Sequence, residues 1–406
     1  MQNKSLITAI TLSLIYLIAL SAFKKKAIKA YPDNPKEEQV SFHQDNVKGN
    51  PKIQVVFALD ATGSMSGLIH AAKEKIWGIA SSMTQSDEAP VIEVGLLFYR
   101  DRGDAFVTQQ VPLSQNLDDV YEKLMQIEAA GGGDAPESVN QALYESIEDF
   151  KWEMKQDNTY KTVFLVGDCP PHMDYSDDVS YSESCVLAKR KDIFLNTILM
   201  GNDVHAEKVW KHIANSNQGS FTKVDMNVND IAITTPYDAE IAKLANQQDE
   251  LRFYYGNEAE KKISNEKKEK SKIISTKAAP VAAAQRAEYN NTATGNASYY
   301  GKNELLNDIK ENKVQIESLS ETELPDEIKT LPKEERKKFV EKSVADKEAL
   351  AKKMSEAVSK RTQYIEVELA KKDKSAVDNS FSNVIYQNIK QQSSKKNIQL
   401  KGNAKF

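Results

Sequence analysis

The sequence is poor in cysteine and has no excess of basic residues. Its 406 residues include two cysteines, Cys169 and Cys185. They permit at most one disulfide in an exported protein, with two buried thiols as the alternative. Lys and Arg number 54 against 59 Asp and Glu, a net charge of −5. Because phosphate-backbone binding needs a basic surface, we exclude nucleic acid as a partner.

Long apolar runs are also scarce, and the one that stands out is at the N-terminus. Residues 6–23 follow Lys4 and match a secretory signal with a short basic start. The run is also long enough to span a bilayer, and the lysines at 24, 25, 26 and 29 would then keep the bulk of the chain in the cytoplasm. We expect a signal peptide or membrane anchor at 1–23 and a linker at 24–50. Export to the periplasm or cell envelope is favoured over a membrane-anchored protein with cytoplasmic bulk.

The region after the linker shows alternating strand and helix patterns. Residues 53–59 are a continuous apolar, β-rich run, typical of a strand buried on both faces. Residues 68–83 have apolar positions at three-to-four spacing, which predicts an amphipathic helix. Further strands are predicted at 91–99, 106–111, 162–166, 193–199 and 220–224, and further helices at 117–127, at 139–150 and around 209–213.

These elements predict an α/β fold with a doubly wound, mostly parallel open sheet over residues 51–226. The connection at 100–104 is too short for a helical crossover. The strands on either side of it should therefore form an antiparallel hairpin at a sheet edge.

The second half of the chain is far more charged. Residues 227–298 indicate a partly helical, low-complexity and flexible connector, and residues 299–406 a charged helical region. A long helix is predicted to run to about residue 369. Its apolar stripe is narrow, so it needs another helix or a partner to cover it, as in a coiled coil. The stripe consists of Val340, Val344, Ala351, Met354, Val358 and Ile365.

Oxygen-bearing side chains gather at the predicted strand ends. Asp60, Thr62 and Ser64 alternate directly after the first strand, and Asp168 follows a neighbouring central strand. Ligands of open parallel sheets bind beyond the carboxyl ends of the strands. Hard divalent cations take oxygen ligands, and Mg²⁺ keeps several waters, which leaves a position open for an incoming group. Helix capping alone would explain one of these polar residues but not three alternating ones.

The stretch from Asp60 to Ser64 resembles the Asp-x-Ser/Thr-x-Ser core of the metal-ion-dependent adhesion site (MIDAS) of von Willebrand factor type A (vWA) domains. Stretches 99–104, 131–137 and 166–172 also agree with bacterial members, and the resemblance covers roughly 51–226. It implies a metal site formed by Asp60, Thr62, Ser64, Asp134 and Asp168.

Asp134 departs from the adhesion pattern, which usually has threonine at that position. Its charge would reduce the pull of the metal on an acidic ligand and favour Ca²⁺. An alternative interpretation is that Asp134 and Glu137 form the capping box of the helix that follows.

Three other polar groups have simpler interpretations than ligand binding. Arg102-Gly103-Asp104 matches an integrin-binding tripeptide, but turn chemistry explains it in a hairpin. The acidic residues at 174, 177 and 178 are expected to form a solvated loop rather than a second cation site. His205 and His212 lack a third metal ligand, so surface or packing roles are favoured.

The resemblance implies a non-enzymatic protein that binds a divalent cation and uses it to engage a protein partner through a carboxylate, in adhesion or assembly at the cell envelope. Mg²⁺ is favoured, with Ca²⁺ or Mn²⁺ as alternatives. One competing hypothesis is a membrane-anchored intracellular adaptor for a larger machine such as an ATPase. Another is a metal-dependent hydrolase, which is disfavoured because Thr62 stands where a haloacid-dehalogenase-like enzyme needs a second carboxylate. The membrane is contacted only through the N-terminal segment, and the oligomeric state is left open.

Overall fold

A computed structural model describes residues 50–133, 135–154, 157–224 and 231–406. The predicted signal peptide or anchor, all of the predicted linker except Asn50, and Asp134 therefore lie outside the described residues. Among the residues that are described, no helix is long and apolar enough to cross a bilayer.

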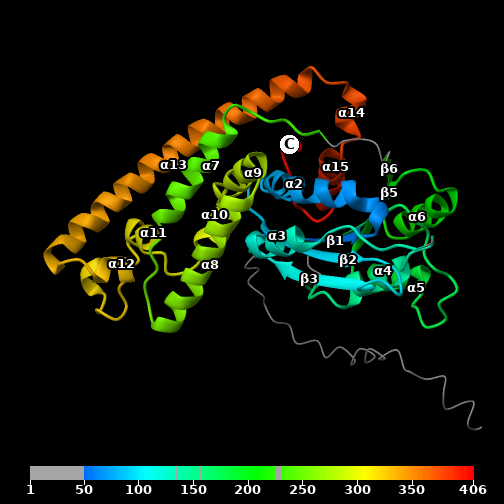
Figure 1. Ribbon diagram of the computed structural model, residues 1–406, viewed down its shortest axis with the longest axis horizontal. Coiled ribbons are helices and arrows are strands. Elements are labelled where there is room, and N and C mark those ends of the chain that lie inside the picture. Colours follow the sequence, from blue (N-terminus) through cyan, green and yellow to red (C-terminus); the bar gives the residue numbers. More distant parts are fainter. Residues whose placement is uncertain (1–49, 134, 155–156, 225–230) are drawn as a thin grey trace, which may run out of the picture. The chain divides into compact units, whose positions relative to one another are not determined.

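The centre of the fold is a six-stranded sheet in the order β3-β2-β1-β4-β5-β6 (Figure 1). Neighbouring strands are parallel except β2 and β3, which form the antiparallel edge pair. The predicted fold class is confirmed. The strands are β1 Lys52–Asp60, β2 Val91–Tyr99, β3 Thr108–Ser114, β4 Thr159–Gly167, β5 Phe194–Met200 and β6 Phe221–Val224.

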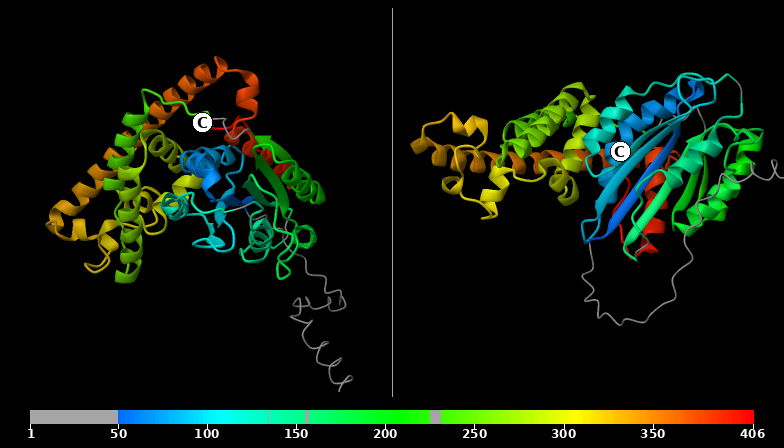
Figure 2. Two further views of the ribbon diagram at one scale, coloured as in Figure 1. Left: turned by 45° about the vertical axis from the view of Figure 1, so that its right-hand side comes forward. Right: turned by 90° about the horizontal axis from the view of Figure 1, so that it is seen from below.

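Helices cover both faces of this sheet, as the two further views show (Figure 2). Successive strand residues point to opposite faces, so Val55 and Phe57 pack toward α2 and α3, whereas Val56 and Ala58 pack toward α4, α5 and α6. The sequence reading missed α5, although Ser180 and Glu183 form a capping box at its start. The helices are α2 Ser66–Met83, α3 Leu117–Gln126, α4 Val139–Glu148, α5 Tyr181–Arg190 and α6 Val204–Ser216, and the 3-10 turn η1 Gly63–Met65 precedes α2.

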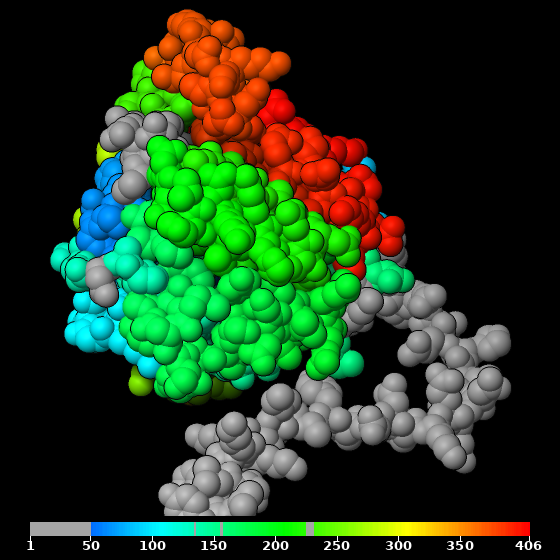
Figure 3. Space-filling model, turned by 90° about the vertical axis from the view of Figure 1, so that its right-hand side faces the viewer, coloured from blue at the N-terminus to red at the C-terminus, as the bar shows by residue number. Residues whose placement is uncertain are grey.

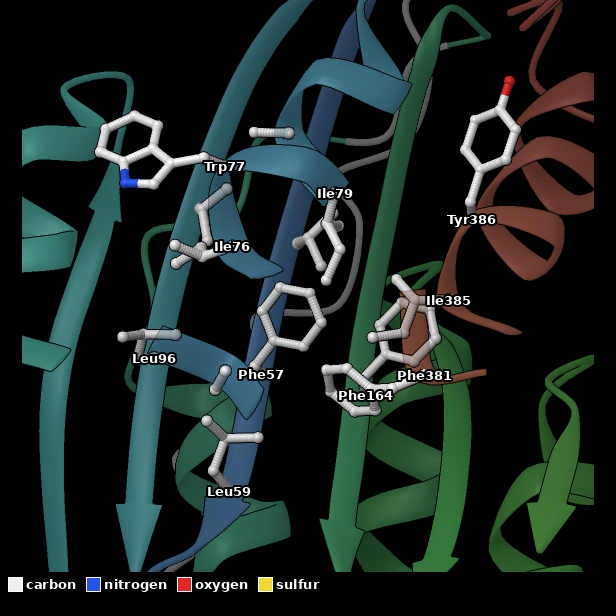
Figure 4. Packing of buried hydrophobic residues seen from close by; sticks show 14 of the residues in the cluster. Phe57, Leu59, Ile76, Trp77, Ile79, Leu96, Phe164, Phe381, Ile385 and Tyr386 are labelled. Atoms are coloured by element: carbon white, nitrogen blue, oxygen red, sulfur yellow. The ribbon is translucent and has the colours of Figure 1, made fainter. Parts of the chain in front are cut away.

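The last helix of the chain, α15 Phe381–Ser394, completes one face of the sheet. Phe381 and Ile385 belong to the same buried cluster as Phe57 and Phe164, and the two phenylalanine rings of the sheet stack at 5.5 Å (Figure 4). The hydroxyl of Tyr160 on β4 donates to Gln392 Oε1 at 2.6 Å. In Figure 3 the red C-terminal residues lie directly against the green residues of the sheet domain. The sheet core is therefore built from both ends of the described chain.

The charged second half forms a series of helices rather than the flexible connector that its composition indicates. Residues 278–284, of low complexity, include the start of α9, where Ala282, Ala283 and Ala284 are buried. Small side chains allow a close approach, and α9 packs along α2. The helices are α7 Asp238–Glu250, α8 Glu258–Lys277, α9 Pro280–Asn290, α10 Ala293–Tyr300, α11 Leu305–Lys310, α12 Asp326–Lys329, α13 Lys333–Ala370 and α14 Lys374–Asp378, with the 3-10 turn η2 Ile316–Ser318.

The predicted long helix is α13, and α7 covers part of its apolar stripe. Of the predicted stripe, Met354 is buried in one cluster with Ile241 and Leu244 of α7, together with Leu350 and Ala357, which the stripe did not include. Ala351 was predicted to lie in the stripe, but it is exposed. The need for a covering helix, inferred from the narrow stripe, is met within the chain itself.

Buried ion pairs join these helices to the sheet domain and to one another. Arg286 of α9 donates from Nε and Nη2 to the two carboxylate oxygens of Asp118 on α3, at 2.6 and 2.7 Å. Arg361 of α13 contacts Asp238 on α7 at 2.9 Å and Glu288 on α9 at 3.2 Å. Each arginine is buried, so both charges of each contact are removed from water together.

Candidate metal centre

The loop after β1 brings together the three residues predicted from its pattern. Asp60 is fully buried at the end of the strand. Its Oδ1 accepts from the backbone N–H and from the hydroxyl of Thr62, at 2.8 and 2.6 Å. The Thr62 hydroxyl lies 3.3 Å from that of Ser64. The turn thus holds one carboxylate and two hydroxyls next to one another.

The end of β4 approaches this loop closely because residue 167 is glycine. A Cβ on Gly167 would lie 2.2 Å from the Tyr99 hydroxyl and 3.0 Å from Asp60 Oδ2. Only a residue without a side chain permits this separation, and it places Asp168 beside Asp60, as the parallel register of β1 and β4 requires. The predicted neighbourhood of Asp60 and Asp168 therefore follows from strand pairing.

A glycine loop closes the site from a third side. The Gly63 N–H donates to the Gly131 carbonyl at 3.1 Å, and the Gly132 N–H donates to Asp104 Oδ2 at 3.0 Å. Gly131 and Gly132 have φ of +79° and +75°, a region that favours glycine. This loop leads into Asp134, whose predicted role as a ligand lies outside the described residues.

Glu137 also lies next to these residues, although the sequence analysis considered it only as part of a helix capping box. The predicted capping box is wrong, because α4 begins at Val139 with Ser138 as its N-cap, and Glu137 precedes the helix. The Glu137 side chain is 3% exposed. Its carboxylate forms no capping hydrogen bond. It interacts electrostatically with Asp60 and Asp168 instead. The one signal in the sequence for this role of Glu137 was that it is an acidic residue in the stretch 131–137, which resembles the family.

Three carboxylates of the site have an oxygen that is buried and has no hydrogen-bond partner among the described residues: Asp60 Oδ2, Glu137 Oε2 and Asp168 Oδ1. Burial raises the pKa of Asp60 to about 7, and the Asp168 charge adds to the rise, although bonds from Thr62 oppose it. Burial raises the pKa of Glu137 to about 8, with Asp60, Asp101 and Asp168 as further causes. Unpaired buried anions are costly, and a cation would satisfy them.

The donor set fits a hydrated, hard cation rather than a fully protein-bound one. Within the described ranges, no group of three or more His, Cys, Asp or Glu side chains is arranged to hold a metal ion. A cation here would have to rely on the hydroxyls of Thr62 and Ser64 and on water, in addition to the carboxylates. Mg²⁺ in proteins is typically held in this way, by few protein oxygens and several waters.

The Arg102-Gly103-Asp104 tripeptide makes internal contacts. Arg102 forms ion pairs with Asp177 and Asp178 at 2.9 and 2.6 Å, and Asp104 supports the glycine loop. The turn interpretation therefore agrees with its geometry, and two of the three acidic residues of the 174–178 loop are paired with Arg102.

Histidine and cysteine make structural contacts in this part of the fold. His172 lies between Asp101 and Asp174, at 3.2 and 2.8 Å, and the ring of His212 packs against the edge of Tyr181. Cys169 and Cys185 are both free. The structure therefore has no disulfide between them. Cys185 is buried, as the alternative prediction has it, whereas Cys169 is half-buried.

Comparison with known proteins gives one family match and several distant likenesses. Residues 54–229 match the family model of the von Willebrand factor A domain. A putative ariadne-like RING finger protein of Acanthamoeba polyphaga mimivirus is 28% identical over 121 residues, which are 30% of this chain and 11% of that protein. The chain thus spans about a tenth of the length of this curated relative.

Two solved structures show similar levels of likeness. A von Willebrand factor type A protein from Catenulispora acidiphila has 15% identity and a TM-score of 0.32, covering 43% of this chain and 39% of that one. Proximal thread matrix protein 1 from the mussel byssus has 13% identity and a TM-score of 0.32, covering 44% and 43%. The family match and the strand order lead to one conclusion: residues 54–229 of this chain form a von Willebrand factor A domain.

Proposed function

We propose that the vWA domain binds a divalent cation at Asp60, Thr62, Ser64 and Asp168 and uses it to engage a protein partner. Domains of this family commonly mediate protein–protein interaction. The observation that carries the proposal is a pair of buried carboxylate oxygens, on Asp60 and Asp168, that have no hydrogen-bond partner among the described residues and lie beside two hydroxyls.

The chemistry divides between the cation and the chain. A bound cation supplies positive charge and an open coordination position for an oxygen of the partner. Asp60 and Asp168 balance that charge, and the Thr62 and Ser64 hydroxyls add neutral oxygen ligands. Mg²⁺ is the favoured ion, with Ca²⁺ or Mn²⁺ as alternatives. A carboxylate is the partner group that matches the open position, and the added charge of Asp134 would weaken that match.

The cellular location that we propose rests on the N-terminal segment, which the sequence predicts to be a signal peptide or membrane anchor. An exported or membrane-anchored protein would carry out adhesion or assembly at the cell envelope. Protease treatment of intact cells separates this from the intracellular adaptor, because digestion of the vWA domain from outside requires export.

The cation is tested by calorimetric titration of the purified full chain with MgCl₂ and MnCl₂. Wild type should bind one equivalent, and Asp60→Asn and Asp168→Asn should each lose most of the affinity. Asp177→Asn is the matched control, because Asp177 is an exposed aspartate paired with Arg102 and should bind as wild type does. Equal binding by wild type and Asp60→Asn would show that the cation is held elsewhere.

Partner engagement needs a separate measurement. Wild-type chain immobilised on beads should retain its partner from envelope extract in Mg²⁺ and release it in chelator, and Asp60→Asn should retain none. Retention that chelator and Asp60→Asn both leave intact would contradict cation-dependent engagement while leaving cation binding to the titration.

A further inference from the structure

Glu137 is held next to the cation site by its backbone. Its N–H donates to the Pro170 carbonyl at 3.0 Å, and its carbonyl accepts from the His172 N–H at 3.1 Å. These two bonds fasten residue 137 to the segment that directly follows Asp168. The position of Glu137 relative to Asp168 is therefore set by main-chain pairing and not by the side chain.

The side chain faces the loop that carries Thr62. A Cβ built on Gly132 would lie 3.3 Å from Glu137 Oε1 and 3.2 Å from Thr62 Cβ. Glu137 and Thr62 thus both lie against the position that a Gly132 Cβ would occupy, so a larger residue there would crowd both side chains.

Among the described residues, no capping bond, ion pair or other structural contact explains why a carboxylate is buried at Glu137. The helix behind it, α4, has no capping hydrogen bond from any side chain, and Glu137 Oε2 is buried with no hydrogen-bond partner among the described residues. Arg100, whose carbonyl accepts from the N–H of Ser138, donates its Nε and Nη2 to the carbonyls of Ala61 and Glu128. Glu137 is therefore 3% exposed as a residue and keeps one carboxylate oxygen, Oε2, without a hydrogen-bond partner among the described residues.

We propose that Glu137 holds the water shell of the bound cation, as a positioning residue that accepts hydrogen bonds from cation-bound waters. This rests on the proposed cation site. Among the described residues, the acidic side chains are not spaced to hold an ion by themselves, so Glu137 would act through water and not as a direct ligand. Groups that orient the ligands of a metal from outside typically change its affinity 10- to 100-fold.

The experiment titrates the full chain with Mn²⁺ alone and measures free Mn²⁺ by electron paramagnetic resonance. Glu137→Gln keeps the shape and removes the charge, and it should weaken Mn²⁺ binding about 10- to 100-fold. Asp60→Asn should abolish binding. Glu128→Gln changes an exposed glutamate just before the glycine loop and should bind Mn²⁺ as wild type does.

A thermal unfolding scan in chelator separates this role from a merely structural one. Without a cation, the neutral amide removes repulsion from Asp60 and Asp168 and can donate to their free oxygens, so Glu137→Gln should unfold at a higher temperature than wild type. If Glu137 only supported the fold, the variant would unfold at a lower temperature and keep its Mn²⁺ affinity, which would overturn the inference.

The two proposals fail in different ways. Wild-type chain that binds no Mn²⁺ removes the cation site and, with it, the role of Glu137. Loss of binding in Asp60→Asn together with full affinity in Glu137→Gln removes only the role of Glu137.

Discussion

The molecule contains two sets of buried charges that are treated in opposite ways. At the strand ends, Asp60, Glu137 and Asp168 each have a buried oxygen with no hydrogen-bond partner among the described residues. At the junction between the sheet domain and the helices, Asp118 is paired with Arg286 through two hydrogen bonds. Buried charges are tolerated when they are paired. The paired set therefore belongs to the architecture, and the unpaired set is the one at which we propose that a cation binds.

The pKa values of two buried aspartates show the same contrast. Burial acts to raise the pKa of Asp118, but the charge and hydrogen bonds of Arg286 lower it below its ordinary value. Burial raises the pKa of Asp60 to about 7, and Asp168 adds to the rise. One carboxylate is thus held as an anion by the chain, whereas the other needs a cation from outside to stay ionised near neutral pH.

The largest expected effect comes from breaking the paired set. Arg286→Met keeps much of the side-chain volume but leaves Asp118 buried without its partner, and it should lower the free energy of unfolding by about 3–5 kcal/mol. Urea unfolding measures this. The double variant with Asp118→Leu should recover most of the loss, because no buried charge remains. A loss below about 1 kcal/mol in the single variant would mean that the pair is not buried as described.

A somewhat smaller effect is expected from titrating the unpaired set. The folded-state pKa values of about 7 and 8 for Asp60 and Glu137 lie above those of unfolded carboxylates, so the folded chain binds more protons. Without divalent cation, the free energy of unfolding should be highest below pH 4 as far as these two groups are concerned. It should fall by about 2–4 kcal/mol as the pH rises from about 4 to about 8, between the unfolded and the folded pKa values.

Urea unfolding from pH 5 to 8 in chelator and in MgCl₂ gives the measurement. Saturating Mg²⁺ should flatten the fall, and Asp60→Asn in chelator should show a smaller fall than wild type. Identical pH dependence in wild type and Asp60→Asn would contradict the assignment of the strand-end carboxylates as the unpaired set.

The smallest effect is expected at an exposed pair. Arg102 pairs with Asp177, whose side chain is 73% exposed, at the rim, where solvent screens the charges. Asp177→Ala should therefore change the free energy of unfolding by less than about 1 kcal/mol and leave Mn²⁺ binding unaltered. A large loss of Mn²⁺ affinity would show that the exposed charges at the rim also contribute to cation binding, which contradicts the distinction between rim and interior.

The sequence predicted the sheet and one part of the site because both depend on local patterns. The alternation of Asp60, Thr62 and Ser64 after an apolar run places their side chains in one turn, and the short connection at 100–104 predicts the antiparallel edge. Parallel pairing then brings Asp168 to the same edge. Each of these steps needs only the period of a strand and the geometry of a sheet.

The parts that were missed depend on contacts between distant segments. The place of Glu137 is set by its backbone bonds to Pro170 and His172, which no local pattern encodes. By composition, the alanine-rich start of α9 resembles a linker. Its alanines are buried because α9 packs against α2, a contact that cannot be inferred from the local sequence. The partner of Asp118 is 168 residues away along the chain, so spacing rules could not find it.

The position of α15 has a consequence for how the protein is made. The last strand of the sheet ends at Val224, but the helix that covers Phe164 begins at Phe381. A ribosome adding about 5–20 residues per second needs on the order of ten seconds or more to synthesise the roughly 150 residues between them. During that interval an apolar area of the nascent sheet lacks its covering helix. Synthesis therefore leaves a time window in which a chaperone has a surface to bind.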